Sequence, residues 1–260
     1  MTDLFNIKGW RAIVTGGTRG LGHGVAEGLL EAGAKVVIFG TNAKVETVAE
    51  DFRAKGFDCQ GLVVNVADRE DRTAGFNKAV ELLGGLDIIV NAAGIQRRYP
   101  CEDFPLTDWN DVINVNMTAP FELSQMAIRE FEKKDVCYGK IINFASMLAF
   151  FGGFTVPAYA ASKGGVAQFS KALCNEVASK GINVNCIAPG YMDTEMNVAL
   201  TDPKNPKFTQ QRYNELTQRI PAHRWGTPDD MKGCCIFLAS HASDYLGGAI
   251  IPVDGGYLVM

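Results

Sequence analysis

Three side chains near the middle of the chain could together move a proton to or from a carbonyl oxygen. Ser146 ends an apolar stretch, and Tyr159 and Lys163 follow after a Gly- and Pro-containing loop. A helix would place Tyr159 and Lys163 on one face, one turn apart, because they are four residues apart. An ammonium beside a phenol favours the phenolate and would bring the phenol's pKa down from about 10. With a hydroxyl from Ser146 to orient a substrate oxygen, the set is typical of ketone and alcohol chemistry.

A Tyr and a Lys at this spacing are usually only a surface pair on a helix, so the elements around them must support the assignment. Strands are expected at residues 11–14, 35–39, 60–66, 86–90, 139–144, 182–186 and 249–253. A first helix is expected to follow the turn at 15–22 and to end at Gly33, and a last one to start at Pro228. Between them, helices are expected at 43–55, 68–83, 108–133 and 159–180. This alternation predicts an α/β fold, a doubly wound parallel sheet of the Rossmann type with helices on both faces.

Composition limits the classes of function. No linker divides the 260 residues, so one domain is expected over 1–260. The net charge of −4 gives no basic surface for nucleic acid. Seven cysteines without Cys-x-x-Cys spacing indicate free thiols in the cytoplasm. The apolar residues 141–161 contain Asn143 and Pro157 and favour a buried strand and loop over a membrane span. Three scattered histidines indicate no metal site.

A Gly-rich turn, TGGTRGLG at Thr15 to Gly22, joins the first strand to the first helix. Glycines let the backbone approach a diphosphate, and the helix N-terminus supplies free N–H groups. The turn therefore predicts a dinucleotide site. The spacing of Gly16, Gly20 and Gly22 is one residue longer than the Gly-x-Gly-x-x-Gly fingerprint.

The end of the second strand bears on the choice of coenzyme. An NAD enzyme usually has an Asp or Glu there to bind the ribose 2′-hydroxyl, whereas Phe39 to Asn42 carry no carboxylate. Arg19 could reach a 2′-phosphate, with Thr41 and Asn42 as further donors. NADP(H) is therefore favoured, with NAD(H) as the alternative and a solvated turn as the other reading of Arg19.

Other polar residues follow or interrupt these elements. Asn91-Ala-Ala-Gly94 leaves room for a ligand, although Asn91 is better suited to holding neighbouring strands together. Asn114 and Asn116 lie inside the predicted helix 108–133, where they would bend it or bond inward. Residues 192–219 are polar and rich in turn formers. An excursion of this size at the end of a strand, about 190–220 in all, is typical of a lid or a substrate wall.

In its whole length the chain resembles the short-chain dehydrogenase/reductase superfamily, through TGGTRGLG, NAAG, Asn116, Ser146, Tyr159-x-x-x-Lys163 and Pro189-Gly190. The resemblance implies NAD(P)-dependent hydride transfer by a tetrad of Asn116, Ser146, Tyr159 and Lys163. Tyr159 would be the acid/base, Lys163 would hold the nicotinamide ribose and depress the phenol's pKa, and Asn116 would position a water. Asn65 stands where the family often has an adenine-binding Asp. The implied coenzyme contacts are Gly16, Thr18, Arg19, Gly20, Leu21, Gly22, Thr41, Asn65, Val66, Asn91, Ala92, Gly94, Tyr159, Lys163, Pro189, Gly190 and Thr194.

Several stretches, among them IQRR at 95–98 and RIPAHRWGTPDD at 219–230, resemble the 2-deoxy-D-gluconate 3-dehydrogenase group more narrowly, also described as 2-dehydro-3-deoxy-D-gluconate 5-dehydrogenases. Gluconate 5-dehydrogenases are the nearest rivals. An Arg fork suits a carboxylate, so Arg97 and Arg98 are expected to bind a keto or hydroxy sugar acid together with Ser146 and Tyr159. His223 and Arg224 are better read as structural, around Trp225.

Two further readings stay open from the sequence. A 3-oxoacyl thioester reductase would share the tetrad and the arginine of the phosphate turn. A nucleotide-sensing protein without catalysis would commonly lack the Tyr or the Lys, and both are present here. The resemblance also implies a homotetramer.

Overall fold

The computed structural model describes residues 3–260, so Met1 and Thr2 of the predicted unit 1–260 lie outside the described part. A seven-stranded parallel sheet runs in the order β3-β2-β1-β4-β5-β6-β7. Its strands are β1 (Arg11–Thr15), β2 (Lys35–Gly40), β3 (Cys59–Val63), β4 (Ile88–Asn91), β5 (Gly139–Phe144), β6 (Ile182–Pro189) and β7 (Ile250–Val253). The strand order reverses between β1 and β4, where doubly wound sheets bind ligands.

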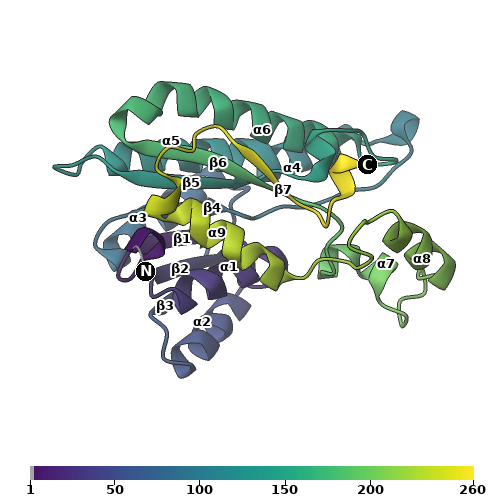
Figure 1. Cartoon of the computed structure of the whole chain (residues 1–260), viewed down its shortest axis with the longest axis horizontal. Coiled ribbons are helices and arrows are strands. Elements are labelled where there is room, and N and C mark those ends of the chain that lie inside the picture. Colours follow the sequence, from purple (N-terminus) through teal and green to yellow (C-terminus); the bar gives the residue numbers. More distant parts are fainter. Residues whose placement is uncertain (1–2) are drawn as a thin grey trace.

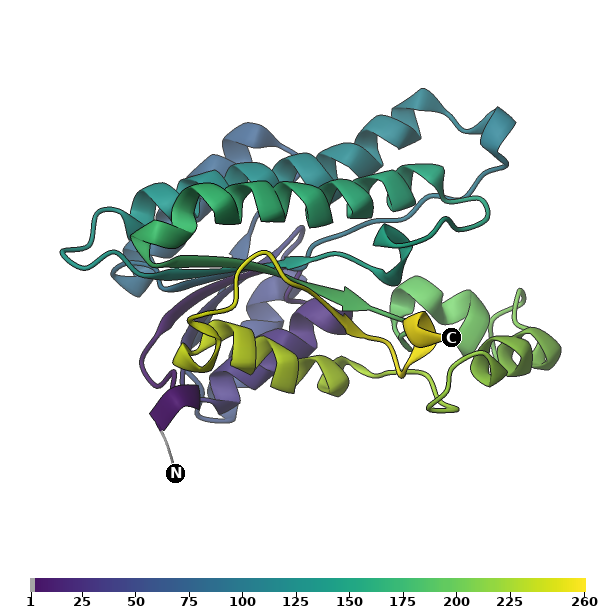
Figure 2. The ribbon, with the colours of Figure 1, turned by 45° about the horizontal axis from the view of Figure 1, so that its top comes forward.

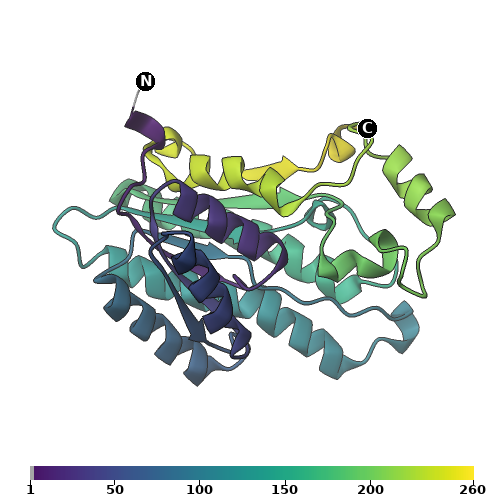
Figure 3. The same ribbon diagram turned by 90° about the horizontal axis from the view of Figure 1, so that it is seen from below.

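Helices cover both faces of this sheet, as predicted. They are α1 (Gly20–Glu31), α2 (Lys44–Ala54), α3 (Arg69–Leu83), α4 (Leu106–Ile113), α5 (Ala119–Phe131), α6 (Pro157–Val177), α7 (Val198–Thr201), α8 (Gln210–Gln218) and α9 (Lys232–Ala239). In Figure 2 the long α6 and the rod of α4 and α5 lie over one face, with α1 and α9 under the other. Figure 3 shows α1 and α2 from below, with α9 beside α1.

The alternation of side chains along each strand divides the core in two. Val14 of β1 faces the cluster that includes Leu29 of α1 and Cys235 of α9, all at most 1% exposed. Its neighbour Ile13 faces the cluster that includes Leu123 of α5 and the C-terminal part of α6. Because successive strand residues point to opposite faces, the apolar runs read in the sequence are buried from both sides.

Several predicted bounds differ from the structure: β6 continues to Pro189, the helix expected from Pro228 starts as a 3₁₀ turn before α9, and two other differences have a clear local cause. β3 ends at Val63 rather than residue 66, because the Asn65 N–H donates to the Asp71 carboxylate (2.7 Å) instead of a neighbouring strand. The predicted helix 108–133 is two α-helices joined by a π-helical turn, Asn114–Thr118. Pro120 follows four residues after Asn116 and has no N–H for its carbonyl, so a regular α-helical ladder cannot pass through this point.

The predicted excursion forms a separate lobe after β6. It holds α7 and α8, which project beyond the sheet in Figure 1. The chain leaves and returns side by side: Met192 and Gly226 form a parallel bridge, and the Gly226 N–H donates to the Tyr191 carbonyl (2.9 Å). Among residues 3–260, no helix is long and apolar enough to cross a membrane.

Candidate active site

The three residues of the opening motif meet at the carboxyl end of β5. Ser146 is 7% exposed and begins a short 3₁₀ turn, Met147–Ala149, where its hydroxyl accepts a hydrogen bond from the Leu148 N–H (3.2 Å). Tyr159 and Lys163 lie in the first two turns of α6. α6 and the end of β5 thus bring the Ser146 hydroxyl and the Tyr159 phenol together; burial raises the pKa of this phenol, and Ser146 opposes the rise.

Lys163 is turned toward the backbone of β5. Its ammonium donates to the Phe144 carbonyl (2.6 Å) and lies 5.5 Å from the centre of the Tyr159 ring. The side chain is 4% exposed, and burial lowers its pKa to about 8. Lys163 thus joins the start of α6 to the end of β5.

The acidity of Tyr159 differs from the sequence-based expectation. Burial raises its pKa, although its ring is partly exposed, while Ser146 and the charge of Arg98 act to lower it. Two cations lie near this phenol: the charge of Arg98 acts to lower its pKa, and the Lys163 ammonium lies 5.5 Å from the centre of its ring.

Asn116 holds the loop that follows β4. Its side chain is 1% exposed, accepts from the Ile95 N–H (2.8 Å) and donates to the Ile95 carbonyl (2.9 Å). A Cβ built on Gly94 would lie 3.4 Å from the Asn116 amide oxygen and 3.8 Å from the Lys163 nitrogen. Gly94, Asn116 and Lys163 thus converge, and the side-chain amide of Asn116 is bound to the Ile95 backbone.

The Gly-rich turn has the shape that a diphosphate requires. Gly16 adopts φ +69°, and a Cβ on Gly22 would lie 2.3 Å from the Gly16 carbonyl oxygen, so only glycine fits. α1 starts at Gly20 without a side-chain cap, which leaves backbone N–H groups of its first turn free for an anion. A Cβ on Gly20 would lie 3.7 Å from that of Thr194, an ordinary contact distance, so the turn lies close to the start of the segment after β6. These residues fit a dinucleotide.

Arg19 meets an acidic residue that the sequence analysis missed. Its guanidinium pairs with Glu195, next to Thr194 at the start of the lid, and both side chains are more than half exposed. Thr41 and Asn42 are exposed at the end of β2. The predicted donors for a 2′-phosphate are thus accessible to solvent, and one of them, Arg19, is paired with the Glu195 carboxylate.

The ends of β1 and β4 are fixed from within by side-chain hydrogen bonds. Asn91 donates to the side chain of Asn143 on β5 (2.8 Å), so its amide joins two strands and does not face the cleft. This agrees with the structural alternative and not with a coenzyme contact by its side chain. Thr15, which the sequence analysis did not single out, accepts from the N–H groups of Ala92 (3.1 Å) and Ala93 (3.0 Å).

The arginine pair separates in the structure. Arg97 points toward Asp108 on α4, with 4.0 Å between Nε and the carboxylate. Arg98 has no ion-pair partner among residues 3–260 and lies near the phenols of Tyr159 and Tyr191; burial lowers its pKa. The two arginines of the predicted pair thus lie near different groups, Arg97 near Asp108 and Arg98 near Tyr159.

The remaining candidates are structural. Arg224 forms a two-pronged pair with Asp230 (2.7 Å for both contacts), and Trp225 is 5% exposed and donates to the Thr217 hydroxyl (3.0 Å). His223 lies in the turn before them at φ +52°. Within residues 3–260 no group of three or more His, Cys, Asp or Glu could hold a metal ion.

Comparison with known proteins adds independent information. The family model described as short chain dehydrogenase matches residues 11–205. A 2-dehydro-3-deoxy-D-gluconate 5-dehydrogenase of Dickeya dadantii is 44% identical over 256 residues, covering 98% of each chain. A 5-keto-D-gluconate 5-reductase of Escherichia coli K12 is 40% identical over 260 residues, covering 100% of this chain and 99% of its own. The crystal structure of a gluconate 5-dehydrogenase from Burkholderia cenocepacia J2315, in complex with NADP and tartrate, superposes with a TM-score of 0.92 at 39% identity, covering 99% and 98% of the two chains.

Proposed function

Because the chain belongs to the short-chain dehydrogenase/reductase family, it is an NAD(P)-dependent oxidoreductase of CH–OH groups, and we propose a small sugar acid as its substrate. The reaction interconverts a ketone and a secondary alcohol. The 2-dehydro-3-deoxy-D-gluconate 5-dehydrogenase (2-deoxy-D-gluconate 3-dehydrogenase) activity is the first choice, and gluconate 5-dehydrogenase is the second, following the names of the relatives.

One observation carries the choice of an acidic substrate. Arg98 is a cation without an acidic partner among the described residues, and its charge acts on the phenol of Tyr159. Arg98 is exposed to solvent, so its guanidinium is accessible to an incoming anion, and a carboxylate matches its fork. A sugar acid bound through Arg98 would have its carbon chain directed toward Tyr159.

The proposed coenzyme is NADP(H). Residues 39–42 carry no carboxylate that would repel a 2′-phosphate, and Arg19 lies in the phosphate turn. The B. cenocepacia relative was crystallised with NADP. When bound, NADP(H) supplies or accepts the hydride. Gly16, Gly20, Gly22 and Thr194 would hold its phosphates and nicotinamide.

Each member of the tetrad has a defined task in this proposal. Tyr159 gives a proton to the carbonyl oxygen during reduction and takes it back during oxidation. Ser146 shares the phenol's hydrogen bond and orients the substrate oxygen. Lys163, which lies beside the Tyr159 ring, would hold the nicotinamide ribose, and Asn116 fixes the Gly94 loop at the edge of the cleft.

The setting of the enzyme is part of the proposal. We infer one catalytic unit over 1–260, with the lobe at about 190–220 as a substrate lid, working as a homotetramer in the cytoplasm. Seven unpaired cysteines among residues 3–260 support a reducing compartment. Light scattering of the purified protein would measure the number of subunits.

The test is a spectrophotometric panel of NADPH and NADH against keto sugar acids, the matching neutral keto sugars and an acetoacetyl thioester. We expect turnover with a keto sugar acid, a rise of about 100-fold in its KM in Arg98→Met, and little change in the KM of a neutral ketone. Arg97→Met is the matched control and should leave the acid's KM within about threefold.

Two outcomes would overturn this proposal. Preference for the thioester would indicate a 3-oxoacyl thioester reductase. Binding of the coenzyme without reduction of any substrate would indicate a nucleotide-sensing protein. Tyr159→Phe should lose turnover and keep coenzyme binding, and retained turnover would remove the phenol from the mechanism.

A further inference from the structure

The π-helical turn between α4 and α5 carries two asparagines that face different loops. Residues two apart on a helix point in directions about 200° apart, close to opposite sides. Asn116 binds the Ile95 backbone beside the proton-transfer residues. Asn114 donates to the Ala67 carbonyl (2.7 Å) in the loop after β3. One turn of helix therefore holds a loop on each side of it.

The loop after β3 depends on such side-chain support. Its own bonds are local: the Ala67 N–H donates to the Asn65 side chain (3.1 Å), and the Asp68 N–H donates to the Asn65 carbonyl (3.0 Å). Two consecutive carbonyls of this loop accept hydrogen bonds from side chains. The Val66 carbonyl accepts from Arg72, and the Ala67 carbonyl accepts from Asn114. Arg72 is 2% exposed and reaches Glu122 of α5 with its other guanidinium nitrogen. The loop is thus anchored to the rod of α4 and α5 at two adjacent points.

We propose that Asn114 is a positioning residue for the adenine end of the coenzyme, acting through its hydrogen bond to Ala67. This inference rests on the proposed NADP(H) site, in which Asn65 and Val66 contact adenine. A tie of this kind lowers the entropy of the loop before the coenzyme arrives, so its loss weakens binding of the adenosine half and leaves the proton-transfer geometry unchanged.

The experiment compares Asn114→Ala with wild type and with Asn110→Ala, an exposed asparagine on the preceding turn of α4. We expect NADPH binding, measured by fluorescence titration, to weaken about fivefold in Asn114→Ala. Turnover supported by reduced nicotinamide mononucleotide, which lacks the adenosine half, should stay within about twofold of wild type. Asn110→Ala should match wild type in both assays.

Hydrogen exchange of the coenzyme-free protein supplies a second readout. We expect amides 65–68 to exchange about fivefold faster in Asn114→Ala, and faster still in Asn114→Asp, whose carboxylate would repel the Ala67 carbonyl. Unchanged exchange and unchanged NADPH binding would overturn the inference, as would an equal loss with the mononucleotide. If wild type itself fails to bind NADPH, the proposed coenzyme fails, while the exchange data still test the Asn114 tie.

Discussion

At the scale of single residues, burial shifts the pKa values of two groups in the site, Tyr159 and Lys163, and so favours the neutral form of each. Burial raises the pKa of Tyr159 and lowers that of Lys163 to about 8, so each is pushed toward its neutral form. The spacing of the two residues predicts their meeting, but not this balance. It depends on the Phe144 carbonyl and on Arg98, which lie elsewhere in the chain.

The buried ammonium leads to a prediction about stability. The pKa of Lys163 drops from 10.5 to about 8, so below pH 8 it is charged in both folded and unfolded protein and destabilises the fold by at most about 3 kcal/mol. Between pH 8 and 10.5 the unfolded state binds more protons, and this destabilisation disappears as pH rises. We expect Lys163→Met to stabilise the protein by about 1–2 kcal/mol at pH 7 and to abolish turnover.

Urea denaturation at pH 7 and pH 10 checks this expectation. Lys171→Met, an exposed lysine on the same helix, is the control and should change stability by less than about 0.5 kcal/mol. A destabilised Lys163→Met at pH 7 would show that the hydrogen bond to Phe144 outweighs the cost of burying the charge.

At the scale of elements, an ion pair between Arg19 and Glu195 joins the phosphate turn to the segment after β6. Arg19 precedes α1, and Glu195 begins the short 3₁₀ turn Glu195–Asn197 that leads into α7. Coenzyme that carries a 2′-phosphate must compete with this carboxylate for Arg19. An exposed pair contributes about 0–1 kcal/mol, so the competition is modest.

We therefore expect Glu195→Gln to bind NADPH about two- to fivefold more tightly, with NADH affinity nearly unchanged because NADH lacks the 2′-phosphate. Titration of both coenzymes into the variant measures the difference. Glu215→Gln, which removes a carboxylate 3.7 Å from Arg212 on α8, is the matched control. An equal gain for NADH would mean that Glu195 acts on a part shared by both coenzymes.

Most of the elements could be predicted from the sequence, and the exceptions have physical causes. In a sheet that is covered on both faces, apolar runs predict the bounds of strands well. The predicted and observed bounds of β5 agree. β3 was predicted too long because Val64 and Val66 are buried although they lie outside the ladder. The π-turn was missed because periodicity cannot detect one added residue, although Pro120 was a readable signal. The pairing of Arg19 with Glu195 joins residues 176 positions apart, which no local pattern reports.

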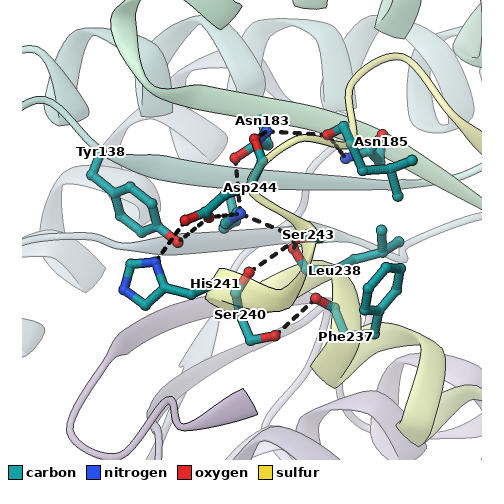
Figure 4. A network of polar contacts seen from close by, with 11 residues as sticks. Tyr138, Asn183, Asn185, Phe237, Leu238, Ser240, His241, Ser243 and Asp244 are labelled. Carbon is teal, nitrogen blue, oxygen red and sulfur yellow. Dashed lines mark hydrogen bonds and ion pairs between the residues drawn. The ribbon is translucent and has the colours of Figure 1, made fainter. Parts of the chain in front are cut away.

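At the scale of the whole molecule, the proposed catalytic residues and a stabilising polar network lie at opposite ends of the sheet. Lys140 lies near the start of β5, about 13 Å along the strand from Phe144. It is fully buried and donates to Asp244 (2.8 Å) and to Asn183 (2.8 Å). Figure 4 shows Tyr138, His241 and Ser243 around Asp244. A buried lysine is otherwise a candidate for chemistry, but this one joins β5, β6 and the segment after α9.

This network leads to a prediction about stability without loss of function. We expect Asp244→Asn to destabilise the protein by about 2–3 kcal/mol, because it leaves the Lys140 ammonium buried without a counterion. Lys140→Met should cost less, since it removes the charge itself. Urea denaturation measures both, and the KM of the coenzyme should stay at the wild-type value. A variant with normal stability and impaired turnover would place the network in the catalytic machinery.

The parallel bridge between Met192 and Gly226 has one more consequence. Everything between them departs from and rejoins the scaffold at two adjacent positions, and the sheet closes without it. The segment is therefore a natural cassette: grafting the corresponding stretch of a homologue, with Thr194 retained, would exchange α7 and α8 while leaving Ser146, Tyr159 and Lys163 in place. Diversification of the substrate range can proceed there without rebuilding the framework.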